Sequence, residues 1–158
     1  MSYAGSLLVN LAADACRSAS VPISLHLDHA QDEESIKRAA DLPFDSIMVD
    51  MSHHEKQENL KKTEELVRYC HNRGIAVEAE PGRIEGGEDG VKDTGLQGLE
   101  EMLTDEEEAT KFVETGIDFL APAFGNIHGR YGGVEKIKLD YDRSAILEPL
   151  SHSGRYSR

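Results

Sequence analysis

The stretch Val-Pro-Ile-Ser-Leu-His-Leu-Asp-His-Ala, residues 21–30, decides the fold that this sequence predicts. Its apolar residues alternate with polar ones from Val21 to Asp28, which is the period of a β-strand. The strand ends in Asp28 and His29, an acid beside an imidazole. Charged groups at the end of a buried strand are costly unless they bind something, and ligands of α/β folds bind at the carboxyl ends of strands. The alternative is a turn aspartate that caps the next helix beside an exposed histidine.

The rest of the chain alternates helical and strand patterns around this segment. Helical spacing predicts helices over 5–19, 32–41, 55–72 and 104–114, the last with Thr104 as the first residue of a capping box. Short apolar runs predict further strands over 44–50, 75–80 and 117–124. This alternation predicts an α/β fold with about four parallel strands and flanking helices.

Length and charge limit the classes of function that the chain can have. Its 158 residues fit one domain, and a hydrophobic share of 39% is ordinary for a globular protein. A net charge of −13 argues against nucleic acid as a partner, although it leaves a phosphorylated small molecule open. The sequence shows no membrane-spanning run and no secretion signal, and Cys16 and Cys70 lack paired spacing. We therefore expect a cytoplasmic protein with reduced cysteines.

Metal-binding residue types follow each predicted strand. Asp28 and His29 follow the first strand, Asp50 the second and Glu80 the third, and His128 lies in Gly-Asn-Ile-His-Gly (125–129) after the fourth. The carboxyl ends of parallel strands share one edge, so these side chains are expected to converge there. Nitrogen and oxygen ligands without cysteine favour a catalytic divalent ion of the zinc type with an open position. Taken singly, Asp50 could cap a helix, Glu80 could be an exposed loop acid and His128 could be a turn histidine.

The glycine-rich segment 81–103 predicts a long functional loop. Its acidic run 85–90 contains no lysine, so it is a poor phosphate cradle of the P-loop kind. It suits a mobile lid that carries Glu88 or Asp89, or else a plain surface loop. Elsewhere, His26 is expected to be a hydrogen-bonded histidine of a barrel interior, and His53 and His54 are expected in a loop.

Five motifs occur in the order of one known family. They are His-Leu-Asp-His-Ala (26–30), Ile-Met-Val-Asp-Met-Ser (47–52), Val-Glu-Ala-Glu-Pro-Gly with Gly-Gly-Glu-Asp (77–89), Thr-Gly-Ile-Asp (115–118) and Gly-Asn-Ile-His-Gly (125–129). Over residues 5–143 the chain resembles class II, zinc-dependent fructose-bisphosphate aldolase and its tagatose-bisphosphate relatives. The resemblance implies a TIM barrel and reversible aldol cleavage of a ketose bisphosphate to dihydroxyacetone phosphate and an aldehyde. It also implies that zinc stabilises the developing charge, so that no Schiff-base lysine is needed.

The resemblance also implies roles for particular residues. His29 and His128 correspond to zinc ligands, and Asp50 and Glu80 to acids of an alternative or second metal position. Asp28 corresponds to the general acid/base that exchanges a proton with the C4 hydroxyl. In the loop, Glu88 corresponds to the residue that moves the proton at the nucleophilic carbon. Finally, Gly129 corresponds to a backbone site for substrate phosphate and a monovalent cation.

The chain departs from the family pattern towards its end. The resemblance covers the third to sixth strands of an eight-stranded barrel and does not reach the histidine-glycine strand that supplies a third zinc histidine. We therefore expect a partial barrel domain over 1–143 and a divergent tail over 144–158, in which His152 lacks a strand context. Arg130 also stands where an acid or a small residue is expected.

Three hypotheses remain open at this stage. The first is an aldolase whose barrel is completed by another chain or a homodimer. The second is a truncated, catalytically inactive aldolase fragment. A third is another metal-dependent barrel enzyme, such as a hydrolase.

Overall fold

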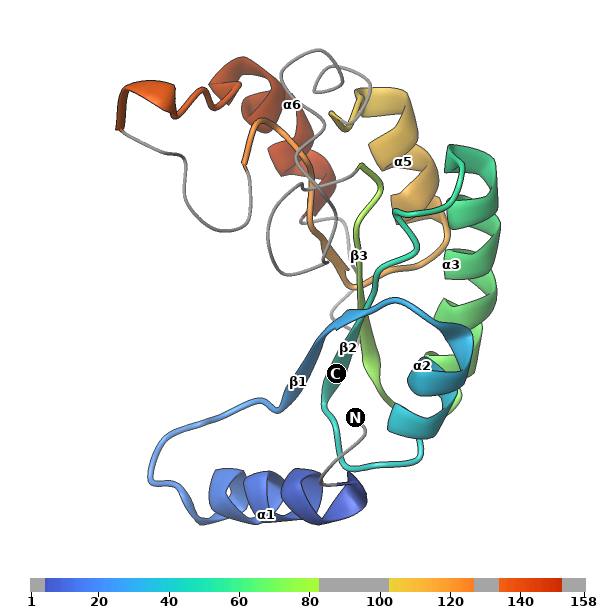
Figure 1. Cartoon of the computed structure of the whole chain (residues 1–158), viewed down its shortest axis with the longest axis vertical. Coiled ribbons are helices and arrows are strands. Elements are labelled where there is room, and N and C mark those ends of the chain that lie inside the picture. The colour runs from blue at the N-terminus through green and yellow to red at the C-terminus, as the bar shows by residue number, and fades with distance from the viewer. Residues whose placement is uncertain (1–4, 83–102, 127–133, 152–158) are drawn as a thin grey trace.

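A four-stranded parallel sheet forms the centre of the molecule, in a computed structural model that describes residues 5–82, 103–126 and 134–151. Its strands are β1 (His26–Ala30), β2 (Ser46–Val49), β3 (Ala76–Ala79) and β4 (Phe119–Leu120), and they lie side by side in sequence order (Figure 1). This arrangement confirms the predicted α/β fold with four parallel strands and flanking helices.

Most of the helices lie on one face of this sheet. The α-helices are α1 (Gly5–Ser18), α2 (Glu33–Ala39), α3 (Lys56–His71), α5 (Glu106–Glu114) and α6 (Tyr141–Ser151), and a short 3-10 helix, η1, covers Val134–Lys136. Figure 1 shows α2, α3 and α5 beside the sheet and α1 across the amino ends of the strands, and α6 packs against α5. Among the described residues, none of the helices combines the length and the apolar character that crossing a membrane requires.

The hydrophobic core lies between the sheet and these three helices. Ile47, Val49, Val77 and Ala79 are fully buried there, and burying each large side chain contributes roughly 1.5–3 kcal/mol. The opposite face of the sheet, here called the inner face, carries the alternate residues of each strand. Register places His26 beside Ser46, Met48 beside Glu78, and Glu78 beside Phe119 on that face.

The first strand begins later than its sequence pattern predicts. Residues 21–25 lie outside β1, and the side chains of Val21 and Ile23 are exposed. Proline at position 22 has no N–H to donate to a sheet. Pairing with β2 begins only at His26, after Asp45 has bonded the backbone N–H and C=O of Leu25. The expectation of a strand over 21–28 is therefore wrong in its first half.

The cap of α5 also differs from the prediction by one residue. Asp105 is the N-cap, and its carboxylate accepts a hydrogen bond from the backbone N–H of Glu108 at 2.7 Å. Thr104 is fully buried, and its hydroxyl accepts instead from the backbone N–H of Ala123 at 2.9 Å. Thr104 thus ties the start of α5 to the segment after β4.

Candidate functional site

Three metal-binding side chains meet at the carboxyl ends of β1, β2 and β3. His29, Asp50 and Glu80 each offer one ligand atom, and these atoms all lie within 4.8 Å of one another. Asp50 and Glu80 are each 1% exposed, so two carboxylates are buried at one edge of the sheet. The convergence that the strand ends predict is therefore present for these three residues.

A slip in the pairing of β1 turns His29 towards this cluster. Leu27 pairs with Ile47 and Ala30 pairs with Val49, so three steps along β1 match two along β2. Leu27 and Ala30 both face the helices, so the two residues between them, Asp28 and His29, lie on the inner side of the sheet. His29 has a φ of +44°, in the left-handed region, which costs a non-glycine residue about 1–3 kcal/mol. The slip thus brings consecutive residues, Asp28 and His29, to the same edge.

Asp50 is held in place by four donors. One carboxylate oxygen accepts from the backbone N–H and the hydroxyl of Ser52, at 3.1 and 2.6 Å. The other accepts from Nδ1 of His29 at 2.9 Å and from Nε2 of Gln31 at 3.1 Å. Burial by itself raises the pKa of Asp50, but the hydrogen bonds from Ser52, His29 and Gln31 outweigh it and hold the pKa below its usual range. Asp50 is therefore ionised, and it could bind a metal directly only by giving up a hydrogen bond.

The charges around His29 favour its protonated form. Burial lowers the pKa of the imidazole, but the hydrogen bond and charge of Asp50, with the charges of Asp28 and Glu80, outweigh burial and raise the pKa. The excess of negative charge that has this effect would equally attract a divalent cation.

Helix α3 positions the backbone at Glu80. Asn59 is 1% exposed, and its amide donates to the carbonyl oxygens of Glu80 and Pro81 at 3.1 and 3.4 Å. Thr63, one turn further along α3, donates to the Asn59 side-chain oxygen at 3.1 Å. These contacts fix where β3 ends and hence where the Glu80 carboxylate lies.

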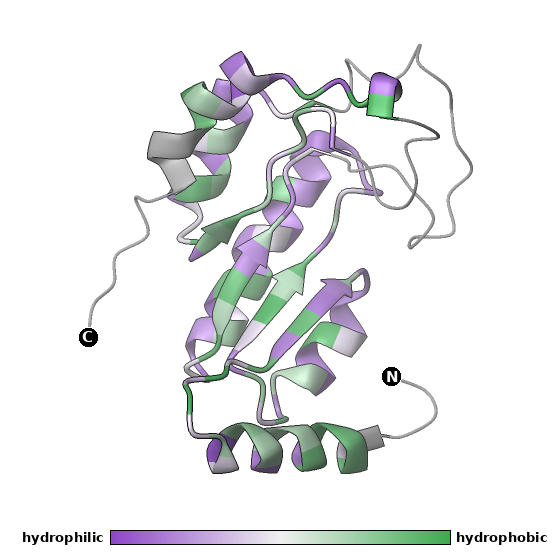
Figure 2. Cartoon of the chain, turned by 90° about the vertical axis from the view of Figure 1, so that its left-hand side faces the viewer, coloured by the Kyte–Doolittle hydropathy of each residue, from purple (hydrophilic) through white to green (hydrophobic). Residues whose placement is uncertain are grey.

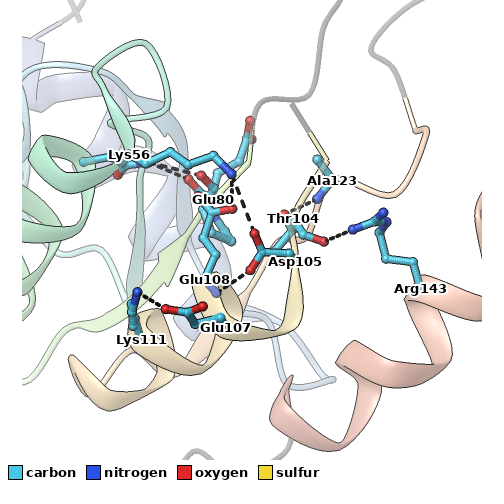
Figure 3. A network of polar contacts seen from close by, with 11 residues as sticks. Lys56, Glu80, Thr104, Asp105, Glu107, Glu108, Lys111, Ala123 and Arg143 are labelled. Atoms are coloured by element: carbon cyan, nitrogen blue, oxygen red, sulfur yellow. Dashed lines mark hydrogen bonds and ion pairs between the residues drawn. The ribbon is translucent and has the colours of Figure 1, made fainter. Parts of the chain in front are cut away.

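A second polar network lies beside Glu80 (Figure 3). Lys56 at the start of α3 contacts Glu108 at 2.9 Å and Asp105 at 3.9 Å, both at the start of α5. On the other side of Asp105, Arg143 of α6 donates to the carbonyl oxygen of Thr104 at 2.8 Å. The network joins three helices around the carboxyl edge of the sheet.

The structure describes four of the seven site residues predicted from sequence. His29, Asp50 and Glu80 form the cluster, and Asp28 lies next to His29 with its side chain 68% exposed. The other three, Glu88, His128 and Gly129, lie outside the described residues, as do the lid segment and Arg130. Their roles stay predictions.

Sequence reasoning did not identify the residues that support the cluster. Ser52 and Gln31 bind Asp50, Asn59 binds the end of β3, and Ser46 lies 2.7 Å from Nδ1 of His26. Asn59 had a usable signal, because it is a polar residue on the apolar side of a predicted helix. The prediction of a satisfied interior histidine holds for one ring nitrogen of His26, since Nδ1 contacts Ser46 on the inner face, while Nε2 has no hydrogen-bond partner in the described residues.

The donor set fits a zinc ion. One imidazole and two carboxylates are donors that zinc accepts, and two buried acids beside one imidazole place an excess of negative charge where a divalent cation would bind. Among the described residues no cysteine joins the cluster, because Cys16 and Cys70 lie elsewhere and are free. Such a partial ligand set leaves coordination positions open for further groups.

Comparison with known proteins identifies the family of this chain. The family model described as fructose-bisphosphate aldolase class-II matches residues 1–149. The chain therefore belongs to the class II fructose-bisphosphate aldolase family. The match extends into the segment 144–158, whose division from the rest at residue 143 stays a prediction, and α6 runs through the first part of that segment.

The similar proteins are aldolases by name. A Coccidioides immitis protein, provisionally named a fructose-bisphosphate aldolase, is 66% identical over 149 residues, covering 89% of this chain and 48% of that protein. A fructose-bisphosphate aldolase of Giardia intestinalis is 44% identical over 134 residues, covering 83% of this chain and 40% of its own. Among solved structures, the YdjI aldolase from Escherichia coli K12 has a TM-score of 0.75 at 29% identity, covering 96% of this chain and 50% of that chain. The chain thus spans about half the length of the relatives it matches.

Proposed function

We propose that this chain carries the metal-binding and proton-transfer part of a zinc-dependent aldolase site. The reaction is reversible aldol cleavage of a ketose 1,6-bisphosphate to dihydroxyacetone phosphate and an aldehyde. The observation that carries the proposal is the cluster of His29, Asp50 and Glu80 at the strand ends, with Asp28 beside it. Membership of the aldolase family supports the choice of reaction over a hydrolase.

His29 and Glu80 are the proposed ligands among the described residues. Nδ1 of His29 is bonded to Asp50, so Nε2 is the nitrogen proposed for the metal and Asp50 is the carboxylate proposed to orient the ring. Direct binding by Asp50, the role that the family resemblance implies, would replace one of its four hydrogen bonds. His128 is the proposed further histidine ligand. When bound, zinc supplies a Lewis acid that withdraws charge from the ketone and hydroxyl oxygens of the substrate.

Asp28 is the proposed general acid/base on the same edge. In the cleavage direction its carboxylate takes the proton of the C4 hydroxyl while the C3–C4 bond breaks, and it returns that proton in the condensation direction. The electron pair of the broken bond remains on C3, where Glu88 is proposed to deliver a proton. Gly129 is proposed to bind the substrate phosphate, together with a monovalent cation, through its backbone.

Zinc binding tests the proposal most directly. The purified 158-residue chain, freed of metal, is titrated with zinc against a chromophoric chelator. We expect one ion per chain, with affinity at least about tenfold lower in His29→Ala and in Glu80→Gln, because each variant loses a ligand. His54→Ala is the matched control, since it removes an imidazole outside the cluster. Equal affinity in all four proteins would contradict the proposed ligands.

Aldol cleavage of fructose 1,6-bisphosphate by the zinc-loaded chain tests the reaction itself. Production of dihydroxyacetone phosphate that disappears in Asp28→Ala supports an active aldolase. Stoichiometric zinc without cleavage would favour the second candidate, a non-catalytic aldolase fragment. The observation behind that candidate is a sheet of only four paired strands in the described residues. A homodimer that completes the barrel would instead show activity rising with protein concentration.

A further inference from the structure

His26 lies on the inner face, between the two acids Asp28 and Glu78. Its Nε2 atom is 3.4 Å from a carboxylate oxygen of Glu78 and 3.9 Å from one of Asp28. On the other side of the ring, Nδ1 lies 2.7 Å from the hydroxyl of Ser46. These four residues come from β1, β2 and β3 and lie on the side of the sheet away from the hydrophobic core.

The hydrogen-bond partners assign one tautomer to His26. A carboxylate can only accept a hydrogen bond, so Nε2, which faces two carboxylates, is the protonated nitrogen. Nδ1 is then an acceptor, and the Ser46 hydroxyl donates to it. Ser46 is 7% exposed and therefore holds the ring from a fixed position in β2.

The Nε2–H group is buried but has no hydrogen-bond partner within the described residues. Its distances to both acids are too long for a good hydrogen bond. A buried donor without a partner costs free energy, so a small movement that brings a carboxylate into reach is favoured. The Asp28 side chain is 68% exposed and has room to make that movement, whereas that of Glu78 is 28% exposed.

In the described part of the chain, few recorded contacts hold the Asp28 carboxylate. Its one recorded ion-pair partner there is His26, at 3.9 Å. A general acid/base must be held close to its working geometry, and a misplacement of about 1 Å can cost roughly 100-fold in rate.

We propose that His26, locked by Ser46, is a positioning residue that orients Asp28 through a hydrogen bond from Nε2. The inference rests on the proposed role of Asp28 as the general acid/base. Glu78 competes for the same N–H and holds it while Asp28 is turned away. In this proposal, His26 and Ser46 on the inner face fix the side-chain orientation of Asp28, which the backbone of β1 alone does not fix.

Imidazole nitrogen NMR tests the contact without any need for activity. Spectra of the ¹⁵N-labelled chain are recorded at one mildly alkaline pH, and His26 is assigned by its loss in His26→Gln. We expect a protonated Nε2 and an unprotonated Nδ1, a mixed tautomer in Ser46→Ala, and a shifted Nε2 resonance in Asp28→Asn. Asp14→Asn is the matched control, because Asp14 is an exposed acid of α1. An Nε2 resonance that is unmoved in Asp28→Asn would overturn the proposal and leave His26 serving Glu78 alone.

Kinetics test the consequence for catalysis. We expect His26→Ala to lower kcat by about 10–100-fold, the cost of a misplaced catalytic group, with KM and zinc content unchanged. His26→Gln should recover part of that loss, because its amide can also donate to Asp28. An unchanged kcat in His26→Ala would overturn the proposal. A wild-type chain without aldol cleavage would count against the proposed function alone, and the NMR comparison would still decide the contact.

Discussion

At the scale of single residues, Asp50 is the best-supported side chain of the candidate site. It accepts two hydrogen bonds from Ser52 and one each from His29 and Gln31, and it is almost completely buried. The four donors occupy both oxygens of the side chain, so the site requires a carboxylate, which has two accepting oxygens. An amide in its place would point N–H groups at other donors.

Replacement of Asp50 tests this dependence. We expect Asp50→Asn to lower the pKa of His29, because the hydrogen bond and charge of Asp50 are the largest effects that offset burial of that imidazole. Zinc affinity should fall by about 10–100-fold, the usual cost of losing a carboxylate that orients a metal-binding histidine. Histidine NMR titration and chelator competition measure the two effects.

Asp41→Asn is the control for that variant. Asp41 is an exposed acid that pairs with Arg73 on the outer surface, so the substitution should leave both quantities unchanged. A His29 pKa that is the same in Asp50→Asn and the wild type would contradict the assigned hydrogen bond.

At the scale of elements, helices α3 and α5 are joined by an ion pair between a half-exposed lysine, Lys56, and a buried acid, Glu108. Glu108 is 8% exposed, and its contact with Lys56 at 2.9 Å is the shorter of two recorded contacts between the two helix starts. Burial raises the pKa of Glu108 despite the opposing effect of Lys56. The folded chain therefore binds the carboxyl proton of Glu108 more tightly than the unfolded chain does.

This raised pKa predicts a dependence of stability on pH. The contribution of Glu108 is fully present below its ordinary pKa of 4.5 and is lost as the pH rises through the higher folded value. Glu108→Gln lacks the titration, so its stability relative to the wild type should increase as the pH rises from 4 to 7. Urea unfolding at several pH values measures the difference. Glu107→Gln, at an 81% exposed neighbour, should show no such trend.

Two phenylalanines, Phe112 and Phe119, test which surfaces of the helices and strands are buried. Phe112 of α5 is 1% exposed in the core, and Phe119 of β4 is 43% exposed on the inner face. We expect Phe112→Ala to reduce the free energy of unfolding by about 3–5 kcal/mol. Phe119→Ala should cost roughly 1 kcal/mol, since the ring is already partly exposed to solvent in the folded chain. Equal losses in urea unfolding would show that the inner face is covered in solution.

At the scale of the whole molecule, apolar side chains gather at one end. Leu7, Leu8 and Leu11 of α1 are 78%, 58% and 66% exposed, and Figure 2 shows apolar residues along this helix at the base of the molecule. In the described residues β1 is also paired on one side only. An open strand edge beside an apolar helix favours association with other chains.

Sedimentation of the purified chain tests this expectation. We expect self-association that rises with concentration and that Leu7→Lys weakens, because the substitution places a charge in the apolar surface. Asn10→Lys adds the same charge to the same helix at an exposed polar position and should have little effect. Sedimentation that responds equally to both variants would show that net charge, and not α1, controls association.

The order of the elements could be read from the sequence because it depends on local patterns. Alternating and helical periodicity located the strands and helices, and the placement of acids and histidines after strands predicted that His29, Asp50 and Glu80 lie close together. The start of β1 could not be read, because Val21 and Ile23 have the right pattern but pair with no strand in the described residues. Which of Thr104 and Asp105 caps α5 depends on Ala123, a partner far away in sequence. Distant partners of this kind leave no mark in a local pattern.

The left-handed backbone at His29 also restricts how the metal preference of this site could change. Besides histidine itself, asparagine, aspartate and glycine adopt that conformation more readily than other residues, and of these three aspartate is a strong ligand for divalent ions. We expect His29→Asp to keep the turn of β1 while shifting selectivity from zinc towards magnesium or manganese, which prefer oxygen. His29→Glu and His29→Cys bring a donor but strain the chain, and competition between metals would separate the three variants. A single substitution, His29→Asp, would then be enough to change the metal preference at this edge of the sheet without changing the backbone.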